Sequence, residues 1–148
     1  MKKMIGFFVL IALLCVVCLN KTDNFAPFYN CDKLLIVSLT EESEDEHIKS
    51  GNVFYYEYES DFKNHIQNMK AQTIGYNFYF SSLNFDKFSK NFDYIYQGET
   101  FEQSYQIYYG FYSGYNDFRY VEGKKVNFQL VNTGDEWILG FPMILTGY

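Results

Sequence analysis

Hydrophobic and polar residues alternate along the C-terminal third of the chain in the way that is typical of β-strands. Four runs stand out, at residues 100–112, 118–121, 126–131 and 136–145. The segments between them (SGYND, EGKK and NTGD) are rich in turn-forming residues. Alternation with a period of two, present in the first three runs, indicates half-buried strands. The pattern predicts a β-meander, against which the rest of the chain packs.

The fourth run differs from the others because it is almost continuously apolar, from Trp137 to Leu145. A strand without alternation is usually covered on both of its faces. We therefore expect residues 136–145 to lie inside the sheet. Pro142 cannot donate a hydrogen bond to a neighbouring strand, so it predicts a bulge or the end of the strand.

Three earlier segments also have strand patterns. Residues 33–40 (KLLIVSLT) form a compact apolar run, which predicts a central strand. Residues 53–58 (VFYYEY) and 73–80 (TIGYNFYF) predict two further strands. Gly75, inside the last of these, predicts a bulge or a close approach of another part of the backbone.

Two segments show the spacing of helices. Phe62, Ile66 and Met69 fall on one face of a short helix predicted at residues 61–70, with Ser60 as its N-cap. A helix of this length is not stable alone, so its apolar face is expected to pack on the sheet. Residues 83–90, with Asn84 as a possible cap, predict a loop or a helical turn. A strand is expected at residues 92–96, paired with the run that begins at residue 100.

These elements predict a mainly β fold, a β-rich α+β class. The expected architecture is an antiparallel sheet or sandwich with a C-terminal meander and one or two short helices. The chain has 148 residues, which suits one domain.

The N-terminus has the pattern of a secretory signal peptide. Lys2 and Lys3 precede an uncharged apolar run at residues 5–19, which is shorter than the roughly 20 residues that span a bilayer. The sequence predicts a signal peptide at residues 1–18, a single β-rich domain at residues 19–148, and secretion to the extracellular space. Retention of the leader as an anchor is the alternative. The mature chain is not expected to span a membrane.

Cysteine and glycosylation signals add little to this picture. Cys15 and Cys18 belong to the predicted leader, so Cys31 remains alone and cannot form an internal disulfide. We expect Cys31 to be a small buried hydrophobe, with an intermolecular disulfide as the alternative. The sequon at Asn20 lies almost at the predicted cleavage site and is expected to be incidental.

Composition adds two constraints. Aromatic residues make up 22% of the chain, with 15 Tyr and 16 Phe, which is more aromatic surface than one small core hides easily. The formal net charge is −6, which argues against nucleic acid as a partner. The oligomeric state does not follow from the sequence.

Polar candidates for chemistry carry no specific motif. The acidic block at residues 41–47 (EESEDEH) predicts a solvated loop, and its spacing does not match an EF-hand. His47 and His65 lack the spacing of metal ligands, so we expect no metal site and no cofactor. No nucleophile or phosphate-binding motif is present. A carboxylate pair, as in a small secreted hydrolase of the glycosidase type, is the alternative function, but the sequence does not select the pair.

The surplus of tyrosine is the remaining signal. A tyrosine side chain combines a large apolar face with a hydroxyl group, which suits recognition of sugars and proteins. We therefore predict a secreted non-enzymatic binding module with an acidic, tyrosine-rich surface, whose partner is an extracellular protein or a carbohydrate. The candidate binding residues are Tyr105, Tyr109, Tyr112, Tyr115 and Tyr120.

Overall fold

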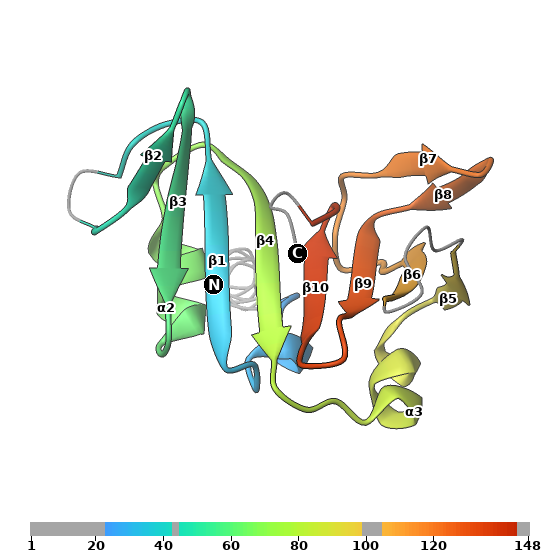
Figure 1. The fold of residues 1–148 in the computed structure, drawn as a ribbon. Helices are drawn as coiled ribbons and strands as arrows, with labels where there is room; N and C mark the ends of the chain where they lie inside the picture. Colours follow the sequence, from blue (N-terminus) through green and yellow to red (C-terminus); the bar gives the residue numbers. More distant parts are fainter. Residues whose placement is uncertain (1–22, 43–44, 99–104, 145–148) are drawn as a thin grey trace, which may run out of the picture.

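The computed structural model describes residues 23–42, 45–98 and 105–144. Within these ranges the chain forms an eight-stranded antiparallel sheet and a separate two-stranded hairpin (Figure 1). The strand order in the large sheet is β2-β3-β1-β4-β10-β9-β6-β5. Its strands are β1 (Lys33–Ser38), β2 (Ile48–Ser50), β3 (Val53–Tyr58), β4 (Thr73–Phe80), β5 (Tyr94–Gln97), β6 (Gln106–Phe111), β9 (Phe128–Asn132) and β10 (Trp137–Phe141). The hairpin consists of β7 (Arg119–Val121) and β8 (Lys124–Val126), and the helices are η1 (Ala26–Phe28), α2 (Phe62–Asn68), α3 (Phe85–Phe88) and η2 (Ser89–Asn91).

The predicted fold class is confirmed, and the described residues form one large antiparallel sheet with short helices rather than a sandwich. β3 and β4 have the predicted bounds, and β1 lies between them as expected of a central strand. The register between β1 and β4 shifts where Val37 faces Gly75 and Ser38 faces Thr73. The irregularity expected at Gly75 is therefore present.

The C-terminal strands confirm the meander with one correction. β5, β6, β9 and β10 are neighbours in the large sheet, and β10 lies inside it, between β9 and β4. The run at residues 118–121, predicted as part of the meander, instead forms β7 of the separate hairpin. β10 ends at Phe141, before Pro142, as the sequence predicts.

Asn127 is the physical reason for the correction. This residue is fully buried, and in the sequence it separates β8 from β9. The single strand predicted at residues 126–131 is therefore interrupted at Asn127. Its Nδ2 donates to the carbonyl oxygens of Tyr112 and Tyr115, and its Oδ1 accepts from the Tyr112 amide at 2.7 Å. Side-chain hydrogen bonds to the backbone offer an alternative to strand pairing. They turn the chain out of the large sheet at this point.

The predicted helix at residues 61–70 is confirmed as α2, but its predicted cap is wrong. Phe62 is buried, and Ile66 and Met69 pack against the core, as their spacing predicts. Asp61 rather than Ser60 occupies the N-cap, with a φ of 52° and no capping hydrogen bond from its side chain. Burial of Phe62, rather than a hydroxyl cap, accounts for where the helix begins.

The segment between β4 and β6 follows the prediction closely. Asn84 caps α3, because its side chain accepts from the Lys87 amide at 3.0 Å. β5 begins two residues after the predicted position and pairs with β6, from Tyr94 opposite Phe111 to Gln97 opposite Tyr108. Residues 99–104, where the sequence predicts the turn and the first part of the next strand, lie outside the described residues.

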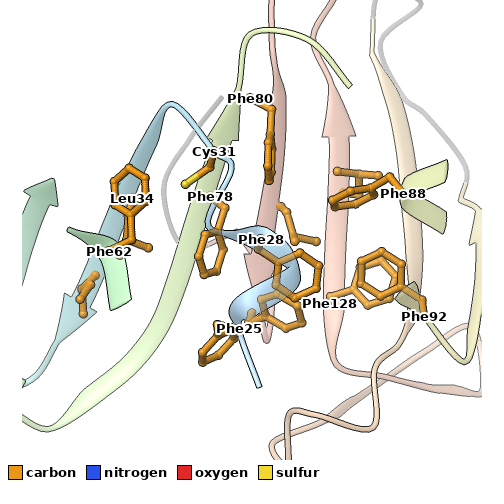
Figure 2. Packing of buried hydrophobic residues seen from close by; sticks show 14 of the residues in the cluster. Phe25, Phe28, Cys31, Leu34, Phe62, Phe78, Phe80, Phe88, Phe92 and Phe128 are labelled. Atoms are coloured by element: carbon orange, nitrogen blue, oxygen red, sulfur yellow. The ribbon is translucent and has the colours of Figure 1, made fainter. Parts of the chain in front are cut away.

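Alternation along the strands places one set of large side chains on a single face of the sheet, which we call the core face. No second sheet covers the core face in the described part of the chain. The cover comes instead from the segment before β1, from α2 and from the α3 region (Figure 2). The buried cluster comprises Phe25, Phe28, Cys31, Leu34, Ile36, Phe54, Tyr56, Phe62, Phe78, Phe80, Phe88, Phe92, Phe128, Leu130, Leu139 and Phe141. Cys31 is thus a buried free thiol, as predicted.

Phe28 lies at the centre of this cluster. Its ring is fully buried, and its centroid lies 5.7 Å from that of Phe78 in β4 and 5.4 Å from that of Phe141 in β10. It also lies 5.8 Å from the ring of Phe88 in α3 and stacks on Phe92 at 5.7 Å. Phe28 therefore joins the N-terminal segment, the middle of the sheet and the α3 region into one core.

Several sequence predictions fall on residues 1–22, 43–44, 99–104 and 145–148, which lie outside the described residues. The signal peptide at residues 1–18, the sequon at Asn20, the domain bounds and secretion therefore stay predictions. No helix in the described part of the chain is long and apolar enough to cross a membrane.

Replacement of Phe28 by alanine is expected to lower the free energy of unfolding by about 3–5 kcal/mol, because it removes a buried ring and leaves a cavity. Urea denaturation of both proteins measures the difference. Phe118→Ala is the matched control, since Phe118 is 40% exposed and its loss should cost under about 1 kcal/mol. Equal losses in the two variants would contradict the central place of Phe28.

Candidate functional site

Glu42 and Asp45 of the acidic block border a depression with a volume of about 430 Å³ beside α2. The residues that line it are Glu42, Asp45, Asn64, His65, Asn68, Met69 and Lys70. The depression brings together two carboxylates and an imidazole, so it is the candidate for the hydrolase alternative.

Both carboxylates of this depression already have partners that hold the loop in place. The Tyr58 hydroxyl donates to Oδ2 of Asp45, and the Tyr58 ring stacks on His65 with 3.6 Å between centroids. Glu42 Oε2 accepts from the Lys70 amide at 2.9 Å. Burial, followed by the hydrogen bond to Asp45, raises the pKa of Tyr58 well above its usual value. These contacts fasten the loop to β3 and α2, which is a structural role.

The second histidine serves the same loop. His47 Nε2 lies 3.3 Å from Glu41 Oε1, and its Nδ1 lies 3.0 Å from the carbonyl oxygen of Asp45. The described residues contain no group of three or more His, Cys, Asp or Glu side chains placed to hold a metal ion.

Two of the five predicted binding tyrosines are partly buried and pack against the core. Tyr112 packs 5.3 Å from Phe28, and its hydroxyl donates to the carbonyl oxygen of Asn24 at 2.5 Å. Tyr115 packs 5.3 Å from Phe141. Burial is the main reason that the pKa values of both tyrosines are raised. The structure therefore gives this pair a packing role at the rim of the core.

The other three predicted tyrosines lie elsewhere. Tyr105 is half-buried just before β6. Tyr109, in β6, faces Tyr96 of β5, with 6.0 Å between the ring centroids. Tyr120, in β7, is 70% exposed. Tyr109 and Tyr120 belong to one aromatic surface, whereas Tyr112 and Tyr115 do not.

This surface is built from two cross-strand pairs and the hairpin beside them. Tyr94 faces Phe111 with 6.2 Å between centroids and 18° between ring planes, in the row next to Tyr96 and Tyr109. These rings lie on the opposite side of β5 and β6 from the core face, because Ile95 and Tyr108, which alternate with them, pack against the core. In β7 the ring of Tyr120 meets that of Phe118 at 5.7 Å.

Two lysines of β8 link the hairpin to the rings. Lys124 Nζ lies 3.9 Å from the ring centroid of Tyr96. Lys125 Nζ lies between two rings, 4.8 Å from Phe111 and 4.2 Å from Phe118. The Tyr96 hydroxyl also donates to the carbonyl oxygen of Val121 at 3.3 Å. We call this surface the hairpin patch; it comprises Tyr94, Tyr96, Tyr109, Phe111, Phe118, Tyr120, Lys124 and Lys125.

The electrostatics of the hairpin patch are mixed. Neither Lys124 nor Lys125 forms an ion pair within the described residues, and their ammonium groups lie on aromatic faces instead. Burial first, and then the charge of Asp93, raises the pKa of Tyr94. Burial first, and then the charge of Glu122, raises the pKa of Tyr96. The hairpin patch thus combines apolar ring faces with charges of both signs.

Sequence reasoning missed most of the hairpin patch. Tyr94 and Tyr96 fell on a predicted strand, and their i, i+2 spacing was the signal that could have placed them on one face. Phe111 lies in the run predicted as a strand at residues 100–112, two positions from Tyr109. The contacts of Lys124 and Lys125 depend on how the hairpin is placed against β6. No local sequence pattern indicates that placement. The structure also separates the acidic block, near β2, from the hairpin patch at the far edge of the sheet (Figure 1).

Comparison of the chain with protein-family models, with curated proteins and with solved structures found no match. Function is therefore inferred from the residues and their geometry.

Replacement of Asn127 by alanine is expected to lower the free energy of unfolding by about 2–4 kcal/mol. The substitution removes the partner of the Tyr112 amide and of the Tyr115 carbonyl oxygen, at about 1–3 kcal/mol for each group, whereas the Tyr112 carbonyl oxygen still accepts from the Tyr115 amide. Urea denaturation measures the loss. Asn116→Ala, at an exposed position of the same turn, is the control and should change stability by less than about 0.5 kcal/mol. A loss in Asn127→Ala no larger than in the control would contradict the role of the amide network.

Stability is also expected to fall at alkaline pH. The pKa is raised in the folded state for Tyr29, Tyr58, Tyr76, Tyr112 and Tyr115, in each case mainly by burial. A raised pKa contributes stability that is fully present below the unfolded-state pKa of about 10 and is lost as pH rises through the folded-state pKa. The free energy of unfolding, measured between pH 8 and pH 11, should therefore decrease above about pH 10.

Tyr115→Phe is the matched variant for this prediction, because it keeps the ring and removes the titrating hydroxyl. It should show a smaller decrease than the unchanged chain over the same pH range. A decrease of the same size in both proteins would show that Tyr115 does not contribute to the alkaline loss.

Proposed function

We propose that this chain is an exported, non-enzymatic binding module that binds a carbohydrate through the hairpin patch. Export rests on the N-terminal pattern of Lys2 and Lys3 followed by an uncharged apolar run. Binding rests on the exposed rings of the hairpin patch.

The exposure of these rings is the observation that carries the proposal. Among the described residues, five large hydrophobic side chains are exposed, and three of them lie in the hairpin patch: Tyr94 at 40%, Phe118 at 40% and Tyr120 at 70%. Single exposed apolar residues are common on proteins, but a contiguous group indicates an interaction site. The clustering of these three rings beside Tyr96, Tyr109 and Phe111 therefore favours a binding surface.

The chemistry of the hairpin patch favours a sugar. One face of a pyranose ring carries mainly C–H groups, and its rim carries hydroxyl groups. Flat aromatic rings suit the apolar face, while ammonium and carboxylate groups suit the hydroxyl rim. Lys124, Asp93 and Glu122 supply such groups close to Tyr94 and Tyr96.

Charge and geometry support this reading over the alternatives. Negative groups beside the patch, together with the net charge of −6, disfavour nucleic acid. For the hydrolase alternative, Asp45 and Glu42 already accept hydrogen bonds from Tyr58 and from the Lys70 amide. The depression near α2 is thus better explained as a fastened loop than as a pair of catalytic carboxylates.

A glycan array tests the proposal, with the chain expressed with its own N-terminal segment and purified as processed by the cell. We expect binding to a defined set of saccharides that falls at least about tenfold in Tyr120→Ala, which corresponds to the loss of about 1.4 kcal/mol. Ile48→Ala is the matched control, because Ile48 is 72% exposed but lies in β2, at the opposite edge of the sheet. It should bind as the unchanged chain does.

Two results would contradict the proposal. One is the absence of any bound saccharide. The other is binding that Tyr120→Ala leaves unchanged, or that Ile48→Ala reduces equally. Capture of a protein that is lost in Tyr120→Ala would retain the hairpin patch as the binding surface and overturn the carbohydrate ligand.

A further inference from the structure

In the described part of the chain, β5 is the last strand at one edge of the large sheet. It has a single neighbour, β6, and its sequence Tyr94-Ile95-Tyr96-Gln97 contains no charge, proline or glycine. Natural sheets usually protect such edges with charges, prolines, bulges or very short strands. An uncharged edge strand is therefore a site where another strand can pair.

The opposite edge of the sheet differs. β2 has only three residues, includes Lys49, and follows directly on the acidic block at residues 41–47. Charge on an edge strand opposes pairing. Two copies that met at β2 would also bring their acidic blocks together.

The hydrogen-bonding direction along β5 identifies which backbone groups face the open side. The Gly98 amide donates to the carbonyl oxygen of Ile107, toward β6. Because this direction alternates within β5, the N–H and C=O groups of Ile95 and Gln97 point away from β6, whereas the Asp93 amide, just before the strand, donates to the carbonyl oxygen of Phe111 in β6. Ile95 is thus an outward-facing backbone position in the middle of the sequence Tyr94-Ile95-Tyr96.

We propose that two copies of this chain associate by antiparallel pairing of β5 with β5, about a two-fold axis at Ile95. In this register Ile95 faces Ile95 of the second copy, and the two exchange both backbone hydrogen bonds. Tyr94 then faces Tyr96 of the second copy, and Gln97 comes next to Asp93 of the second copy, whose own amide donates to the carbonyl oxygen of Phe111 within its chain. The strand is self-complementary, as an isologous interface requires. Ile95 meets Ile95, Tyr94 meets Tyr96, and no two like charges face each other.

The paired strands also have matching faces. Ile95 lies on the core-face side of the sheet, and Tyr94 and Tyr96 lie on the side of the hairpin patch. Pairing would bring the two hairpin patches together into one aromatic surface across the two-fold axis. The association does not depend on what the hairpin patch binds, so it can fail while the proposed function holds.

Disulfide trapping tests the register. The full chain carrying Cys15→Ser and Cys18→Ser keeps only Cys31, which is buried. Into this background we introduce Ile95→Cys. Directly opposed residues of a hydrogen-bonded antiparallel pair have Cα atoms about 5.5 Å apart, within the range that a disulfide bridges. Mild oxidation should therefore give a covalent dimer, and Ile48→Cys, at the β2 edge, is the control that should stay monomeric.

A charge change at Gln97 provides a second test that keeps Ile95 in place. Gln97 is exposed, so both substitutions should fold. Gln97→Glu places a carboxylate near Asp93 of the second copy, and Gln97→Lys places an ammonium group there, twice in each dimer. The dimer dissociation constant, measured by sedimentation equilibrium, should rise about two- to thirtyfold in the first variant and fall by a similar factor in the second.

Opposite signs for the two Gln97 variants, together with crosslinking at position 95 alone, would support the β5 pair. The pair is overturned if the unchanged chain stays monomeric at every concentration, if positions 95 and 48 crosslink equally, or if both charge changes shift the dissociation constant in the same direction.

Discussion

The structure depends on the packing of the Phe28 ring at the centre of the core face. The described strands form one large sheet and no second sheet to oppose it, so other elements must cover its apolar face. The segment before β1 supplies Phe25 and Phe28, and α2 and the α3 region supply Phe62 and Phe88. None of these short elements is stable alone, because helices of this length need tertiary packing. The cover and the sheet therefore form as one cooperative unit joined through Phe28.

This arrangement explains why the chain has so many aromatic residues. Short covering elements bury enough apolar area only if each contributes a large ring, since a ring buries more surface than an aliphatic side chain. Tyrosine has a second use where it meets the rim of the core, as in Tyr112, whose hydroxyl donates to Asn24. The rings of the hairpin patch do not pack at the rim of the core in this way, and Tyr120 is 70% exposed. Structural need thus accounts for one group of aromatic residues, and ligand binding is our explanation for the other.

Much of the fold could be predicted because its signals are local. Alternation gave the bounds of β3 and β4, and the spacing of Phe62, Ile66 and Met69 gave α2. The errors have long-range causes. Asn127 turns the chain toward residues 112–115, and this diverts the run at residues 118–121 into a separate hairpin. The same turn packs Tyr115 against the core. Alternation alone could not predict this, because it does not show which face of an outer strand is covered. Of the hairpin patch, the sequence identified Tyr109 and Tyr120 as candidate residues, but not the lysines that join them.

The central claim is that the tyrosines form two populations, one that completes the core and one that is displayed on the hairpin patch. Nitration of the folded chain with tetranitromethane, followed by peptide mapping, tests this division most directly. The structure predicts that Tyr120 is modified first, that the partly buried Tyr112 and Tyr115 react more slowly, and that Tyr56, which is fully buried, reacts only when the chain unfolds. Modification of Tyr112 and Tyr115 in the folded chain as fast as Tyr120 would contradict the account.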